Sequence, residues 1–283
     1  ILYAPDFRQS LPYQAYLSKA LKQHDVFVEY LSDYRRGLPL YRGLKSATTR
    51  PDILHLHWPE AYFQSRHPLQ NWIRKQRYLL DLYLTTKKVP LVFTAHNLLP
   101  HNRETEPGVA RNIAHTMRQA RIVFAHSEEA KKQLKKHFGV HPSRCEVIPY
   151  GDHAVNMLPP CDRSEARQAL NLPEHETICI MFGTVSPYKG ILKCVDYWKK
   201  NQLEAASLYV VGPVTNNAYA EKIRNAAEDQ KNIQLRTSKS WLGESELRQW
   251  LSAADCALFN YKEIFTSGAA ALARSFGLPL LIP

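Results

Sequence analysis

Short apolar runs alternate with helix-like stretches along the whole chain. In the first half, the apolar runs lie at residues 1–5, 26–31, 52–58, 90–97, 121–127 and 145–151. Between them, helical patterns cover roughly 13–24, 73–84 and the stretches that begin at Gly108 and Glu128. Strands and helices in alternation are typical of a parallel sheet with helices on both faces. The pattern therefore predicts an α/β fold.

A polar, proline-containing stretch separates two similar halves of the chain. It covers residues 152–176, and the alternation starts again at 177. We expect one Rossmann-like domain at 1–155, a linker with a first helix at 156–176, and a second Rossmann-like domain at 177–283. The chain starts at Ile1 and stops at Pro283 inside an apolar run, so we expect this second domain to be incomplete at its C-terminus.

Two turns in the second half carry residues suited to phosphate. The segment FGTVSPYKG at 182–190 joins an apolar run to a helical pattern and contains Gly183, Thr184 and Lys189. Glycine lets the backbone approach a ligand closely, and lysine offers a point charge to phosphate oxygens. The turn 263–268 leads into a helix of small residues that Thr266 or Ser267 can cap. Either turn alone could simply connect a strand to a helix, but their pairing in one domain favours an anion site.

Other polar residues also follow predicted strands, where parallel sheets bind ligands. They are Asp6, Arg8, Gln9, His57, Glu60, His96 and Asn97 in the first half; in the second half, Gly212 takes a corresponding position at the end of a strand. His96 is either a hydrogen-bonding or acid–base group or a structural residue, because histidine titrates near neutral pH. His126 and Ser127 can be explained as the cap of the helix that follows them.

The positive charge of the chain is confined to its first half. Residues 1–150 contain 23 Lys and Arg against 12 Asp and Glu, whereas the remainder contains 14 of each. A basic half indicates an anionic partner, which could be a membrane surface, an acidic saccharide or nucleic acid, although a solvated basic face is an equal alternative for any one cluster. Nucleic acid is the least favoured, because the basic clusters form no recognised binding module.

The composition of the chain indicates the cellular compartment and bears on whether a metal or cofactor is bound. Five scattered cysteines without metal-ligand spacing indicate reduced thiols in a cytosolic protein. No run of 18 apolar residues and no signal peptide is visible, so we expect a cytoplasmic location, with peripheral attachment to the inner membrane face as an option. No pair of carboxylates follows a strand in the pattern of a metal site, so neither a metal nor a cofactor is expected.

Several motifs, in this order and spacing, resemble those of the retaining glycosyltransferases of family 4. They are TAHN at 94–97, VFAHSEEAKKQL at 123–134, VIPYGD at 147–152, FGTVSPYKG, LYVVGP at 208–213 and the stretch 254–283. The resemblance implies the GT-B architecture, in which two Rossmann-like domains face each other across a cleft. It also implies a nucleotide-sugar donor held mainly by the second domain.

The resemblance assigns roles to individual residues. Lys189 would contact the donor diphosphate, Glu263 would lie near the donor sugar, and Thr266, Ser267 and Gly268 would offer backbone amides to phosphate. His96 would lie near the reacting sugar, so His96, Lys189 and Glu263 form the expected catalytic set. Asp6, Arg8, Gly183, Thr184 and Gly212 complete the donor side, and Gln9, His57, Glu60 and Asn97 the acceptor side.

The chain departs from the family at two positions. Thr184 stands where an arginine usually follows the glycine, and Ala271 stands where a second glutamate usually binds ribose. We expect transfer of a hexose, with retention, from a nucleotide sugar to a saccharide or lipid-linked saccharide, with a UDP-sugar favoured over GDP-mannose. The alternatives are an inverting GT-B transferase, with Asp6, Glu60, His96 or Glu104 as its base, and a degenerate protein that binds nucleotide sugar or polysaccharide without turnover.

Overall fold

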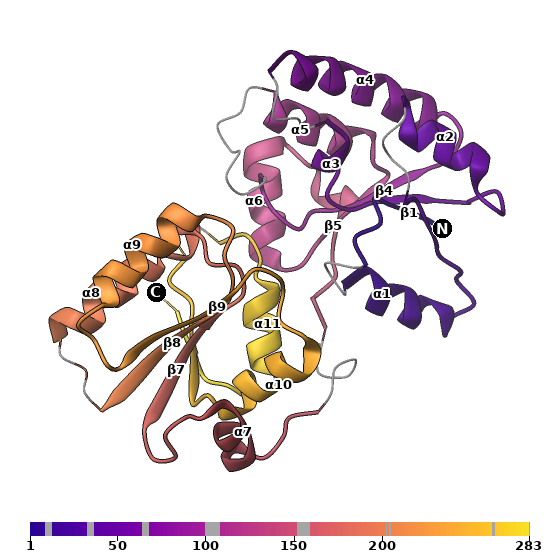
Figure 1. Cartoon of the computed structure of the whole chain (residues 1–283). Helices are drawn as coiled ribbons and strands as arrows, with labels where there is room; N and C mark the ends of the chain where they lie inside the picture. Colours follow the sequence, from indigo (N-terminus) through magenta and orange to yellow (C-terminus); the bar gives the residue numbers. More distant parts are fainter. Residues whose placement is uncertain are drawn as a thin grey trace. The chain divides into compact units, whose positions relative to one another are not determined.

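The computed structural model divides the chain into two compact units, Ile1–Pro149 and Tyr150–Pro283. It describes residues 1–8, 13–32, 37–63, 68–99, 108–151, 159–201, 203, 205–261 and 264–282. The expected boundary after residue 155 falls within 152–158, outside these ranges. Both units are α/β layers with a parallel sheet, as the alternation of apolar runs predicts (Figure 1).

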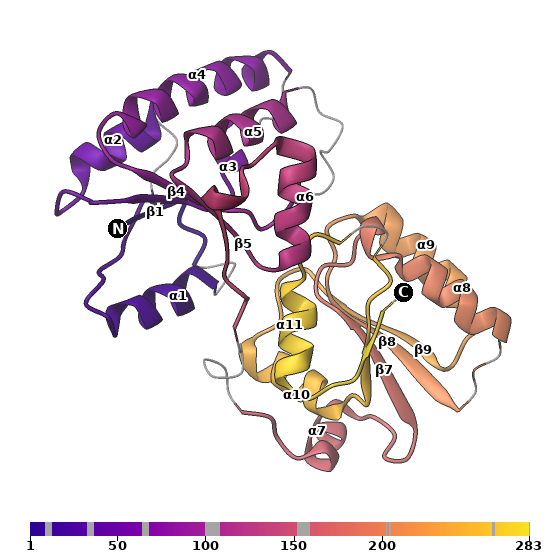
Figure 2. The ribbon, with the colours of Figure 1, turned by 180° about the vertical axis from the view of Figure 1, so that it is seen from behind.

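The sheet of the first unit has the strand order β2-β1-β3-β4-β5-β6, and all of the pairings are parallel. Its strands are β1 (Leu2–Ala4), β2 (Glu29–Tyr30), β3 (Leu54–Leu56), β4 (Leu91–Thr94), β5 (Ile122–Ala125) and β6 (Cys145–Val147). Its helices are α1 (Tyr13–Lys22), α2 (Pro39–Ser46), α3 (Glu60–Phe63), α4 (Pro68–Thr86), α5 (Val109–Gln119) and α6 (Glu128–Phe138), with a short turn η1 (Pro142–Arg144). Helices α2, α3, α4 and α5 lie together on one side of this unit, opposite α1 (Figures 1 and 2).

Helix α2 is held at its start by a carboxylate from α4. Leu38, which precedes the helix, has no side-chain oxygen to cap it. The two carboxylate oxygens of Asp81 instead accept the backbone N–H groups of Leu40 and Tyr41, each at 2.8 Å. Asp81 is buried, and a negative charge at the start of a helix interacts favourably with the helix dipole.

The second unit has a sheet in the order β11-β10-β7-β8-β9, again with parallel pairings. Its strands are β7 (Thr177–Phe182), β8 (Ala206–Pro213), β9 (Ile233–Ser238), β10 (Cys256–Leu258) and β11 (Leu280–Leu281). Its helices are α7 (Arg163–Leu170), α8 (Ile191–Asn201), α9 (Asn217–Ala227), α10 (Glu244–Ala253) and α11 (Gly268–Ser275), with a short turn η3 (Pro187–Lys189).

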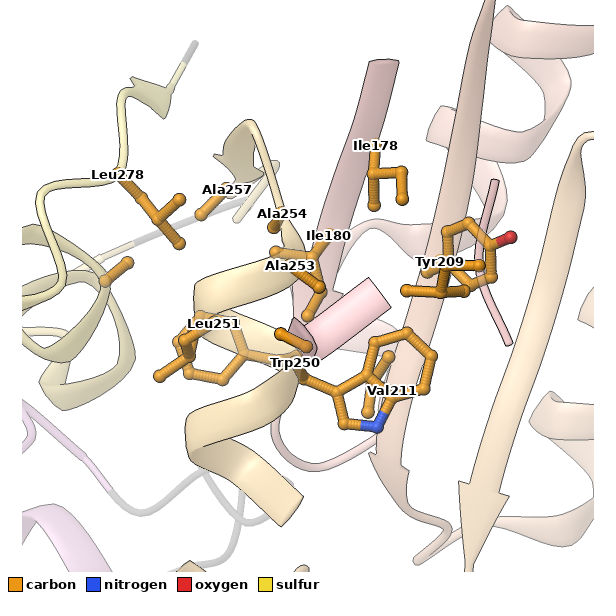
Figure 3. Packing of buried hydrophobic residues seen from close by; sticks show 14 of the residues in the cluster. Ile178, Ile180, Tyr209, Val211, Trp250, Leu251, Ala253, Ala254, Ala257 and Leu278 are labelled. Atoms are coloured by element: carbon orange, nitrogen blue, oxygen red, sulfur yellow. The ribbon is translucent and has the colours of Figure 1, made fainter. Parts of the chain in front are cut away.

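The side chains of the central strands alternate between two separate cores of this unit. Ile178 and Ile180 face the core on the α10 side, where Trp250 lies against Tyr209 and Val211 with the Trp250 and Tyr209 rings 5.6 Å apart (Figure 3). Cys179 and Met181 face the opposite core, which α8 and α9 cover. The central strand β7 is therefore buried on both faces, and it carries the FGTVSPYKG turn at its carboxyl end.

Candidate functional site

In the first unit, Asp6 and Arg8, which follow β1, form an ion pair with each other. The guanidinium of Arg8 donates from Nε and Nη2 to the two carboxylate oxygens of Asp6, at 2.9 and 2.8 Å, and lies 3.7 Å from the centre of the Tyr30 ring. The hydrogen bonds from Arg8 hold the pKa of Asp6 below its usual value. Arg8 is therefore already neutralised by Asp6. Gln9, predicted beside them, lies outside the described residues.

Three histidines at the ends of β3, β4 and β5 form a directed chain of hydrogen bonds. His126 Nδ1 lies 2.8 Å from the carbonyl oxygen of Ile148, so this nitrogen donates. In a neutral ring the other nitrogen accepts, so His126 Nε2 accepts from His96 Nδ1 at 3.3 Å. His96 Nε2 then accepts from His57 Nδ1 at 3.1 Å. The chain leaves His57 Nε2 as a buried acceptor with no partner among the described residues.

His96 is enclosed by this chain. Its ring stacks on Trp58, with ring centres 4.0 Å apart and planes inclined by 14°, and only 5% of its surface is exposed. Tyr13 contacts the rings of His57, His96 and His126 edge-on. For His96 to contact a sugar, as predicted, its ring would have to lose one of its bonds to His57 and His126. Otherwise it could affect the sugar only through these neighbouring side chains.

Glu60 and Asn97 lie beside His96 around a small cavity. The cavity has a volume of about 20 Å³, and Trp58 and Thr94 are also among its lining residues. This volume suits one water molecule rather than a sugar. Although part of Glu60 reaches solvent, burial raises the pKa of its carboxyl to about 7, because a low-dielectric environment disfavours the charged form. Glu60 can therefore exchange a proton near neutral pH.

The histidine cluster predicts that acid destabilises the first unit. Burial lowers the pKa of His55 to about 3 and those of His57 and His96 well below 6.5, so folding requires neutral rings. Stability is then present above pH 6.5, the pKa of histidine in the unfolded chain, and is lost as the pH falls below it, by about 1.4 kcal/mol per pH unit for each histidine. The pKa of Glu60 is raised from 4.5 to about 7, so its protonation makes the folded state more stable as the pH falls from 7 to 4.5 and offsets part of this loss. We expect a net loss of about 3 kcal/mol per pH unit below 6.5.

Urea unfolding at a series of pH values, followed by amide hydrogen exchange in β3, β4 and β5, measures this slope. His57→Gln should make it shallower by the contribution of one proton. The exposed residue His137 on α6 provides the control, since His137→Gln should leave the slope unchanged. A first unit equally stable at pH 7.5 and 5.5 would contradict the neutral cluster.

In the second unit, the turn after β7 folds over the ammonium group of Lys189. The Nζ atom donates to the carbonyl oxygen of Phe182 at 2.8 Å, and the residue is 6% exposed. Burial lowers the pKa of Lys189 to about 8, so most of the amine stays protonated at neutral pH. Gly183, at φ 87°, makes room for it, because a Cβ atom there would lie 2.8 Å from Nζ. Gly183 and the Lys189 ammonium therefore lie side by side in this turn.

Two more glycines, which have no Cβ atom, allow neighbouring backbone segments to approach this turn closely. A Cβ atom at Gly212, which has φ 137° at the end of β8, would collide with the carbonyl oxygen of Gly183. A Cβ atom at Gly190, at φ 65°, would collide with the carbonyl oxygen of Asn260. The turns after β7, β8 and β10 therefore meet at one edge of the sheet. Thr184, at the position expected for a second cation, is half-buried at this edge.

The start of α11 offers backbone N–H groups. The Ser267 hydroxyl caps the helix by accepting the N–H of Ala270 at 3.1 Å, and the N–H of Ala271 bonds to the Ser267 carbonyl at 3.0 Å. The N–H groups of Gly268 and Ala269 precede these bonds and have no intrahelical acceptor. Such a helix start favours an anion. Glu263, predicted beside it, lies outside the described residues.

Tyr261 joins the two turns into one site. The Nζ atom of Lys189 lies 5.9 Å from the centre of its ring, and its hydroxyl lies 3.4 Å from Ser267 Oγ. Tyr188 packs against Tyr261 with ring centres 5.6 Å apart, and Tyr150 interacts with Thr266. Burial raises the pKa values of these three tyrosines, so their hydroxyls stay protonated and can donate. Sequence reasoning did not single them out, although each tyrosine lies in a quoted motif.

The second unit therefore gathers Gly183, Thr184, Lys189, Gly212 and the Thr266–Gly268 turn, and the first unit gathers His57, Glu60, His96 and Asn97. With Tyr150, Tyr188 and Tyr261 beside it, the former set combines a cation, helix-start amides and phenol hydroxyls, which together can bind a diphosphate. The latter provides a hydrogen-bond chain and a carboxyl that titrates near pH 7. Within the described ranges, no three His, Cys, Asp or Glu side chains form a metal-binding group.

The sequence matches known glycosyltransferases. The sequence model of glycosyltransferase family 4 matches residues 1–151. A GDP-mannose:glycolipid 4-β-D-mannosyltransferase of Xanthomonas campestris pv. campestris is 27% identical over 251 residues, which cover 87% of this chain and 65% of the relative. A D-inositol 3-phosphate glycosyltransferase of Rhodococcus jostii is 32% identical over 110 residues, 36% of this chain and 24% of the relative. The chain thus spans 65% of the length of the mannosyltransferase.

Solved structures share the fold at lower identity. Sucrose-phosphate synthase from Thermosynechococcus elongatus superposes with a TM-score of 0.70 at 15% identity, over 99% of this chain and 80% of the synthase. The Anabaena protein HepE in complex with UDP-glucose gives a TM-score of 0.65 at 17% identity, over 93% of this chain and 69% of HepE. These matches confirm the predicted α/β fold with two parallel sheets of the GT-B type.

Proposed function

Because the chain belongs to glycosyltransferase family 4, we propose that it transfers a hexose from a nucleoside diphosphate sugar to a saccharide or lipid-linked saccharide. One observation carries the proposal: the buried Lys189 and the capped start of α11 meet around Tyr261. The glycolipid named in the Xanthomonas relative supports a lipid-linked acceptor. Glu263 stays a proposed donor-sugar contact, and Gln9 a proposed acceptor contact.

The proposed chemistry follows from the charges that develop during transfer. Breaking the anomeric C–O bond leaves positive charge on the sugar and negative charge on the departing diphosphate. The Lys189 ammonium and the N–H groups of Gly268 and Ala269 would stabilise that diphosphate. Such electrostatic stabilisation is usually the largest contribution to the rate enhancement of an enzyme. With retention, the acceptor hydroxyl enters on the side of the leaving group, and a phosphate oxygen takes its proton.

An inverting reaction is the second candidate, favoured by the raised pKa of Glu60. Inversion needs a base, and a carboxyl with a pKa of about 7 fits that task better than Asp6, whose pKa Arg8 lowers. The Xanthomonas relative forms a β-linkage by name, and from an α-linked donor a β product requires inversion. The anomeric configuration of the product, read by NMR, separates the two candidates. An α product from an α-linked donor would exclude Glu60 as an inverting base.

The donor base and sugar can be identified by titration. The sequence favours a UDP-sugar, and HepE binds UDP-glucose. The relative that aligns with 87% of this chain uses GDP-mannose, and we give it precedence because it is more similar in sequence than HepE. Calorimetric titration of the full-length protein should show GDP-mannose binding at least tenfold more tightly than UDP-glucose. Tighter binding of UDP-glucose would restore the preference drawn from the sequence, and binding of neither would contradict the diphosphate site.

A further inference from the structure

The solvent-facing side of α4 is apolar. Leu69, Trp72, Ile73, Leu80 and Tyr83 are 72%, 63%, 47%, 51% and 50% exposed. Their spacing along a 19-residue helix places them on one stripe, which only Gln76 interrupts. We call these five residues the outer stripe of α4. Five large apolar side chains in one stripe exceed the single exposed residues that are normal for a soluble surface.

The opposite side of α4 already has its partners. Tyr78, Asp81 and Leu82 are buried, and the helix packs against α2, α3 and α5. In both views of the first unit, α4 is the outermost helix of this layer, and none of the described segments of the unit covers its outer side (Figures 1 and 2). The outer stripe is therefore not needed for the core of the unit.

The charges on and beside the outer stripe are positive. Asp81 is the only carboxylate in α4, and it is buried in its bonds to Leu40 and Tyr41. Arg77 lies within the helix, Lys87 and Lys88 follow its end, and the Lys87 ammonium lies 5.2 Å from the centre of the Tyr83 ring. The surface that α4 presents is thus apolar and cationic, in the half of the chain that carries the whole positive excess.

This combination selects an anionic lipid surface over a second copy of the chain. Two α4 helices packed face to face would bring basic residues together without any exposed carboxylate from α4 to balance them. In a membrane interface, Trp72 and Tyr83 would take the positions that such rings prefer, and Leu69, Ile73 and Leu80 would reach the acyl boundary. Arg77, Lys87 and Lys88 would contact anionic headgroups.

We propose that the outer stripe of α4 docks the protein on an anionic membrane surface, with the helix lying in the plane of the interface. Within the described ranges, no helix has the length and apolar character of a membrane span. The inference deepens the proposed function, on which it rests for the reason to dock: a lipid-linked acceptor is held at a membrane.

Vesicle sedimentation of the full-length protein tests the proposal. Vesicles of phosphatidylcholine mixed with phosphatidylglycerol should bind the protein in a salt-sensitive manner, and vesicles of phosphatidylcholine alone should bind it weakly. The double variant Trp72→Gln/Leu80→Gln should lose at least about tenfold in affinity, because it removes two large apolar side chains from the interface. Both side chains are exposed, so the variant should keep its thermal unfolding midpoint.

A matched control is Trp241→Gln, which removes a tryptophan that is 54% exposed in the second unit and should leave vesicle binding unchanged. Equal binding of the double variant and wild type would overturn the proposal. So would a dimer, seen by light scattering, that the double variant abolishes, or protection of α4 from hydrogen exchange by another part of the full-length chain. Donor titration without vesicles separates the two claims: if it holds while vesicle binding fails, only the docking surface is wrong.

Discussion

Lys189→Met should lower the turnover of the nucleotide sugar by about 100- to 1000-fold while the second unit stays folded. The ammonium group is the one cation that the turn after β7 places against Tyr261, 5.9 Å from its ring centre. Its bond to the Phe182 carbonyl at 2.8 Å holds the charge at the turn before any ligand arrives. Methionine keeps an unbranched side chain of similar volume at this buried position, so the substitution removes charge with little loss of packing.

Lys193→Met is the matched control, because Lys193 is exposed on α8 and lies four residues after Lys189 in the chain. Its turnover should equal that of the wild type. Gly183→Ala offers a second route to the same result, since the new Cβ atom would lie 2.8 Å from Nζ and displace the ammonium. Turnover in Lys189→Met as high as in Lys193→Met would refute the role of the buried lysine.

Arg167→Ala should destabilise the second unit by about 3 to 5 kcal/mol, because it leaves several buried carbonyl groups without a donor and removes a large buried side chain. The guanidinium is fully buried and donates to the carbonyl oxygens of Ala253, Pro173, Glu174 and Glu176, at 3.0, 3.0, 2.6 and 2.9 Å. It also bonds to Asp255 Oδ2 at 2.7 Å. Alanine would leave these acceptors without their donor and open a cavity between α7, α10 and the start of β7.

Arg163 provides an internal comparison, because it bonds to the other oxygen of Asp255 at 3.0 Å with 45% of its side chain exposed. Arg163→Ala should cost at most about 1 kcal/mol, as exposed ion pairs do. Urea unfolding of both variants, with hydrogen exchange to report on the second unit, measures the difference. Equal unfolding midpoints would show that Arg167 does not tie these segments together.

The sheets could be predicted from the sequence because parallel strands buried on both faces are continuous apolar runs. TICIMF and SLYVV are such runs, and the structure has strands at both places. Helix α2 was not predicted, because its start depends on Asp81, 41 residues from Leu40 in the chain. The burial of Arg167 could not be predicted either, because its hydrogen-bond acceptors lie in the loop before β7 and at the end of α10.

Local features of the candidate site could be predicted where the residues that form them are neighbours in the chain, but not where the fold brings distant residues together. The Gly183 and Lys189 turn and the Ser267 cap each lie within one short segment. Their connection through Tyr261, and the enclosure of His96 by His57 and His126, depend on separate strands. The helix expected at 73–84 lies within α4. Its exposed side is apolar as well, and a count of apolar positions does not distinguish that side from the buried one.

The most direct test of the proposed function is acceptor-dependent release of nucleoside diphosphate by the full-length protein. The protein is incubated with a panel of nucleotide sugars, with and without a glycolipid acceptor fraction, and the released diphosphate is measured. We predict release from one nucleotide sugar that rises when acceptor is added and is lost in Lys189→Met. Tight binding of a nucleotide sugar without release from any donor would contradict a transferase and leave the protein a nucleotide-sugar-binding protein.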